Sequence, residues 1–75
     1  MHMTSYTVVY QDTVGYQKTT EIDAKSRKDA AICVVQNDIL SRFEAMDISI
    51  SVYQTNYETM EDANVFDAVT LLSSQ

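Results

Sequence analysis

Few side chains in this sequence have the type and spacing that catalysis requires. A serine or cysteine nucleophile normally needs a histidine beside it as its base. The only histidine is His2, near the N-terminus, and we expect residues 1–4 to be disordered or a cloning remnant. The only cysteine, Cys33, falls beside the apolar stripe of a predicted helix, where the ordinary role of a cysteine is that of a small buried hydrophobe. The sequence therefore predicts no catalytic residue, and we interpret the protein as non-enzymatic.

Carboxylates are the remaining groups that could do chemistry. Glu21 and Asp23 share one face of a predicted strand, and Glu58, Glu61 and Asp62 are close together near the C-terminus. A catalytic carboxylate needs a dry pocket, for which a 75-residue domain with one helical layer has little room. The acidic stretch 58–67 has neither the glycine nor the ligand spacing of an EF-hand, and a single Gly excludes a glycine-rich phosphate loop. We expect no metal and no cofactor.

The charge is distributed very unevenly along the chain. All five bases lie within residues 1–42 and are balanced there by five acids, whereas residues 43–75 contain six acids and no base, so the net charge of −6 comes from that last part. Nucleic acids and anionic membranes attract Lys and Arg, so both are disfavoured as direct partners. A basic protein surface is the natural complement.

Tyrosines accompany these acids, and Tyr is a residue that interfaces favour. We therefore predict a partner-binding surface in the C-terminal half, formed by Glu44, Asp47, Tyr53, Tyr57, Glu58, Glu61, Asp62 and Asp67. The alternative is that the carboxylates form a solvated face whose only effect is to keep the protein soluble.

The elements that would position these residues follow from hydrophobic periodicity. Residues 5–11 are rich in β-branched and aromatic side chains and predict a strand, and residues 16–23 alternate as a second strand of the same hairpin, with Gly15 in the turn. Ser26 is typical of an N-cap with Asp29 at position N3, and apolar residues at three- and four-residue steps predict a helix from about Arg27 to Ala45. Residues 47–54 alternate strictly, with Ile48, Ile50 and Val52 facing inward.

The tail, residues 58–73, fits two structures. One is a single helix capped by Thr59 with Asp62 at N3; the other is a short turn followed by a fourth strand over residues 65–72. The absence of Pro and the single Gly favour the helix.

The expected fold is a single α+β domain spanning residues 1–75. Connection rules predict a three-stranded antiparallel sheet of order 2-1-3 with a long helix on one face, topology ββαβ plus a C-terminal helix. The opposite face would be polar and free to bind or dimerise, and would carry Thr7, Val9, Gln17, Thr19, Glu21, Ser49, Ser51 and Tyr53. A small domain without disulfides suggests a cytoplasmic location.

The junction Ile22-x-Ala24-x-Ser26-x-x-Asp29-Ala30, with the hairpin before it and the helix and strand after it, resembles small proteins of phages and mobile elements, including some anti-CRISPR proteins. The resemblance spans roughly residues 5–54. It implies a small acidic inhibitor that blocks a nucleic-acid-binding surface of a host defence protein such as a CRISPR effector complex. That family has no common motif, so no residue role is implied. The alternative function is a homodimeric structural or assembly module without inhibitory activity.

Overall fold

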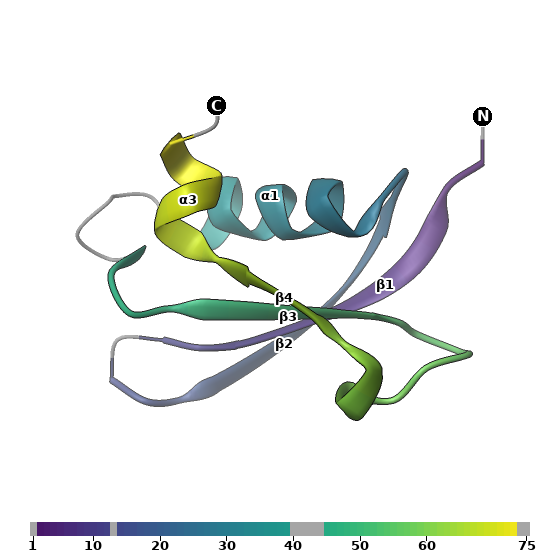
Figure 1. Ribbon diagram of the computed structural model, residues 1–75, viewed down its shortest axis with the longest axis horizontal. Helices are drawn as coiled ribbons and strands as arrows, with labels where there is room; N and C mark the ends of the chain where they lie inside the picture. The colour runs from purple at the N-terminus through teal and green to yellow at the C-terminus, as the bar shows by residue number, and fades with distance from the viewer. Residues whose placement is uncertain (1, 13, 40–44, 74–75) are drawn as a thin grey trace.

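The structure is a computed structural model that describes residues 2–12, 14–39 and 45–73. These residues form an antiparallel sheet of four strands in the order β2-β1-β3-β4, and α1 and α3 cover one of its faces (Figure 1). The elements are β1 (Thr4–Gln11), β2 (Gln17–Ala24), α1 (Arg27–Asp38), β3 (Ser49–Gln54), the 3-10 turn η1 (Met60–Asp62), β4 (Asn64–Asp67) and α3 (Ala68–Ser73). The predicted class and the order 2-1-3 are confirmed, and β4 extends that order by one strand.

The β1–β2 hairpin is held at its turn by one carboxylate. Asp12 Oδ1 accepts hydrogen bonds from the backbone N–H groups of Val14 and Tyr16, at 3.0 and 2.9 Å. Gly15 supplies the left-handed backbone of this turn, with φ at 94°. The two strands begin at Thr4 and Gln17, one residue away from the expected positions, and Tyr16 belongs to the exposed turn.

Helix α1 begins as the sequence predicts and ends earlier. Ser26 Oγ accepts a hydrogen bond from the backbone N–H of Asp29 at 3.1 Å, which confirms the cap. The expected continuous helix to Ala45 is wrong, because the backbone leaves helical geometry at Ile39, with φ −119° and ψ 88°. The side chain of Asn37 bonds to the carbonyl oxygen of Cys33 in the last turn, a competition with helix continuation that is typical of Asn. The expected continuation through residues 40–44 lies outside the described residues.

The core lies between the sheet and the two helices. Its largest completely buried side chains are Val8 on β1, Val34 and Val35 on α1, and Ile50 and Val52 on β3. The inward positions of the third strand are therefore as predicted. Met46, expected on the apolar stripe of the long helix, is 57% exposed and lies in the turn that follows Ala45.

The tail combines parts of both expected structures. Thr59 and Asp62 do form the predicted capping box, but they cap the single turn η1 and not a long helix, so the predicted helix over 58–73 is wrong. The chain then forms β4 against β3, with Phe66 opposite Ile50, and α3 follows at once. A strand replaces a helix here because β3 would otherwise leave its backbone N–H and C=O groups unpaired along that edge, and because Phe66 packs against the core as part of the sheet.

Candidate protein-binding surface

The sheet face that carries neither α1 nor α3 is here called the helix-free face (Figure 1). The register fixes which strand residues point to it, because side chains alternate between faces and paired residues share one face. They are Ser5, Thr7, Val9, Gln11, Gln17, Thr19, Glu21, Asp23, Ser49, Ser51, Tyr53, Val65 and Asp67. All eight residues predicted for the polar face are among them.

The helix-free face is negatively charged. Its strand residues include three acids, Glu21, Asp23 and Asp67, and among the outward positions of the described strands none is basic. The one base within a strand, Lys18, is paired with Tyr10 and so points to the helix side. Two of the three acids come from the N-terminal hairpin. The period-two alternation of residues 16–23 already placed Glu21 and Asp23 on one face, although neither was among the predicted partner-binding residues.

The centre of the face is neutral and tightly packed. Thr7 and Val9 are only 5% and 8% exposed although they point away from the helices, because β1 is an inner strand with neighbours on both sides. Thr7 Oγ1 and Thr55 Oγ1 form a hydrogen bond of 2.9 Å, which ties the chain after β3 to the central strand. The face therefore presents a fixed, uncharged centre with carboxylates around it.

A cavity of about 320 Å³, here called the face cavity, opens on this surface. It is lined by Val9, Tyr10, Gln11, Gln17, Asp47, Ser49, Ser51 and Met60. Asp47 has a left-handed backbone with φ at 63°, a conformation that Asp adopts more readily than most residues. The carboxylate of Asp47 is exposed and has no hydrogen-bond or ion-pair partner within the described part of the chain.

The predicted site residue Glu58 is engaged inside the protein. Its Oε1 lies 2.5 Å from Arg27 Nη2, and its Oε2 accepts a hydrogen bond from the backbone N–H of Gln54 at 2.9 Å. Arg27 also donates to the carbonyl oxygen of Val52 at 3.3 Å and lies over the ring of Tyr6. The hydrogen bond from Arg27 lowers the pKa of Glu58, and the same bond raises the pKa of Arg27. Glu58 thus joins the loop after β3 to the first turn of α1, and its charge is locally neutralised.

Two further predicted acids have structural hydrogen bonds. Asp62 Oδ2 accepts from the backbone N–H and the hydroxyl of Thr59, at 3.3 and 3.1 Å. Asp67 Oδ2 accepts in the same way from Thr70, at 3.0 Å in both bonds, and so caps the first turn of α3. These carboxylates are exposed, so they still contribute to the potential of the surface.

The other predicted residues are divided between separate regions. Tyr53 points to the helix-free face, Asp47 borders the face cavity, and Glu61 follows the cavity residue Met60 in η1, on the side of the sheet opposite α1 (Figure 1). Tyr57 lies in the turn after β3 and is 84% exposed. Glu44 lies outside the described residues. The predicted set is therefore not one patch, and Glu58 in particular belongs with the helix side.

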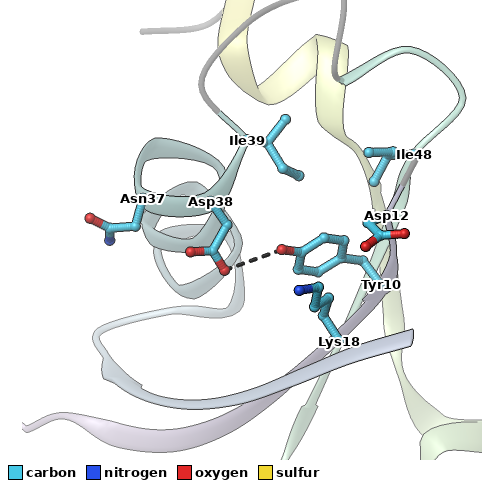
Figure 2. A pocket seen from close by; sticks show the side chains of 7 residues that line it. All are labelled: Tyr10, Asp12, Lys18, Asn37, Asp38, Ile39 and Ile48. Carbon is cyan, nitrogen blue, oxygen red and sulfur yellow. Dashed lines mark hydrogen bonds between the residues drawn. The ribbon is translucent and has the colours of Figure 1, made fainter. Parts of the chain in front are cut away.

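A second cavity of about 490 Å³ lies on the helix side, lined by Tyr10, Asp12, Lys18, Asn37, Asp38, Ile39 and Ile48 (Figure 2). Tyr10 and Asp38 point toward one another, and the Tyr10 hydroxyl donates to Asp38 Oδ2 at 3.2 Å. Burial, helped by the negative charge of Asp38, raises the pKa of Tyr10 to about 12. The phenol therefore stays protonated at neutral pH and serves as a hydrogen-bond donor. This pair could not be predicted from the sequence, because residues 28 positions apart in the chain meet only through the packing of α1 on β1.

Other kinds of site find no support in the described ranges. No group of three or more His, Cys, Asp or Glu side chains there is placed to hold a metal ion. No helix in those ranges is long and apolar enough to cross a lipid bilayer. Comparison with protein-family models, with curated proteins and with solved structures finds no match to this chain.

Proposed function

We propose that this protein is a non-catalytic binding domain that docks through its helix-free face onto a basic surface of another protein. The observation that carries the proposal is the charge of that face: its outward strand residues include Glu21, Asp23 and Asp67 and, over the described strands, no base. Ordinary surfaces mix both signs of charge, so a one-signed face favours a partner of the opposite sign.

The shape and chemistry of the face support protein binding in particular. Apart from Val9, its central strand presents hydroxyl and amide side chains, those of Ser5, Thr7 and Gln11, which allow close approach. Val65, 64% exposed, and Met60, 47% exposed, add apolar contact area beside the acids, and Tyr53 adds an aromatic ring with a polar tip.

The finer proposal is that docking inhibits a nucleic-acid-handling protein of the host cytoplasm. Proteins of that kind neutralise phosphates with Lys and Arg, and a rigid array of carboxylates would compete for the same basic groups. The resemblance of residues 5–54 to small phage and mobile-element proteins, some of which inhibit CRISPR effector complexes, points in the same direction. The same carboxylates argue against the homodimeric alternative, because two copies meeting through this face would bring like charges together.

The test is capture of partner proteins from a host lysate by immobilised protein, with matched variants. In Glu21→Gln plus Glu61→Gln, two exposed acids without internal hydrogen bonds in the described structure are neutralised. Glu21→Gln alone is also compared with a matched control of one neutralised acid, Asp29→Asn, since Asp29 is exposed on α1, on the helix side. We expect the face variant, and not the control, to lose capture of a basic protein. We expect added salt to weaken capture as the screening length falls from about 10 Å at ~0.1 M to about 3 Å at ~1 M.

The captured protein is then purified and offered DNA or RNA as a competitor. Competition between the nucleic acid and this protein supports inhibition at a shared basic surface. Capture that is equal for the face variant and the control, and insensitive to salt, would refute the electrostatic docking proposal.

A further inference from the structure

We infer that the face cavity is a socket for one arginine side chain of the partner. This inference rests on the proposed docking of the helix-free face and specifies the chemistry at its centre. A volume of about 320 Å³ is at the lower end for ligand pockets, which range over about 300–1,000 Å³, and suits one long side chain better than a cofactor.

The lining offers both parts of what an arginine needs. Val9, which is almost fully buried, and Met60, which is half exposed, provide apolar surface for the aliphatic stem. The hydroxyl oxygens of Ser49 and Ser51 and the amide oxygens of Gln11 and Gln17 are acceptors around the same opening. The exposed carboxylate of Asp47 supplies the negative charge, and within the described chain no internal partner uses it.

Arginine fits this lining better than lysine does. The guanidinium group has five N–H donors in one plane and is less strongly hydrated than an ammonium group, so several neutral acceptors and one carboxylate can bind it together. Lysine concentrates its charge at one point, so its binding would depend mainly on the ion pair with Asp47. Arginine is also enriched among residues that contribute most to protein interfaces.

The experiment is an NMR titration of the isotopically labelled full chain, at low ionic strength, with N-acetyl-arginine methylamide. Two analogues serve as controls. The lysine analogue has the positive charge without the planar guanidinium group, and the norleucine analogue has the aliphatic chain without a charge. Asp47→Asn is the test variant, because Asn also tolerates the left-handed backbone at this position. Glu21→Gln is its matched control, with the same change of charge on the same face but outside the cavity.

We expect the arginine analogue to shift the amide signals of the cavity residues more strongly than the lysine analogue does, with no saturable shift from norleucine. Asp47→Asn should weaken the arginine affinity about threefold to fivefold, the effect of one solvent-exposed ion pair, and Glu21→Gln should change it by less than about twofold. Shifts that are spread over all surface carboxylates, or that are equal in Asp47→Asn, overturn the socket.

The two proposals can fail separately. If neutralising Glu21 and Glu61 leaves partner capture unchanged while the arginine analogue still binds the face cavity, the proposed docking through the acidic face is wrong. The proposed arginine site is then still supported. If capture depends on those acids but the analogue binds nowhere in particular, docking stands and the socket is wrong.

Discussion

Replacing Ile50 by Val, compared with a change at Val65, tests which face of the sheet is buried, because a change on the buried face should cost more stability. Ile50 is completely buried on β3 and lies opposite Phe66 of β4. Removing one buried methylene costs about 0.8 kcal/mol in transfer free energy, and the small cavity left behind brings Ile→Val changes to about 0.5–1.5 kcal/mol. A chain of 75 residues has a total stability of roughly 4–11 kcal/mol at about 0.05–0.15 kcal/mol per residue, so the variant should stay folded.

The matched control is Val65→Ala on β4, next in sequence to Phe66. It deletes more carbon than Ile50→Val does, yet Val65 points to the helix-free face and is 64% exposed, so we expect a loss below about 0.5 kcal/mol. Thermal unfolding followed by circular dichroism measures both variants. We expect Ile50→Val to lower the midpoint by about 4–8 °C, the shift for ~1 kcal/mol in a domain of this size. If Val65→Ala is the more costly change, the alternation of β3 and β4 described here is incorrect.

Two further predictions concern pH. Because Arg27 lowers the pKa of folded Glu58, this carboxylate stabilises the fold above its unfolded pKa of about 4.3, and the stabilisation is lost as pH falls through the folded value. Glu58→Gln should therefore reduce the urea midpoint at neutral pH and converge with wild type in acid; a constant difference at all pH values contradicts the ion pair. Tyr10, with its pKa raised to about 12, stabilises the fold below its unfolded pKa of about 10, and this effect is lost as pH rises from about 10 to about 12. The difference in tyrosinate absorbance between wild type and Tyr10→Phe should show one step near pH 12; a step near the ordinary value of about 10 would show that Tyr10 is not buried beside Asp38.

Local patterns in the sequence predicted most of the first fifty residues. The alternation of the strands, the turn glycine and the Ser26 cap depend on contacts within a few residues, and the structure contains all three. The sheet order 2-1-3 also followed from the sequence, because the handedness of a crossover leaves few arrangements.

The structure of the tail, residues 58–73, could not be predicted from such local patterns. Thr59 and Asp62 form a real capping box, and that local signal was read as the start of a long helix. The free edge of β3 competes for the same residues, and pairing with it satisfies backbone groups and packs Phe66 against the core. A cap reports where a turn begins and contains no information about how far the helix continues.

The candidate surface shows the same division. By itself the sequence determined that the charge is one-signed after position 42 and that one sheet face is polar, because composition and period-two alternation are properties of the chain. Only the tertiary structure decided which carboxylates lie on the same face. It joined Glu58 to Arg27 and brought Glu21 and Asp23 from the hairpin onto the face that carries Asp67. Strand register and helix packing connect residues that are distant in sequence, and the potential of a surface depends on those connections.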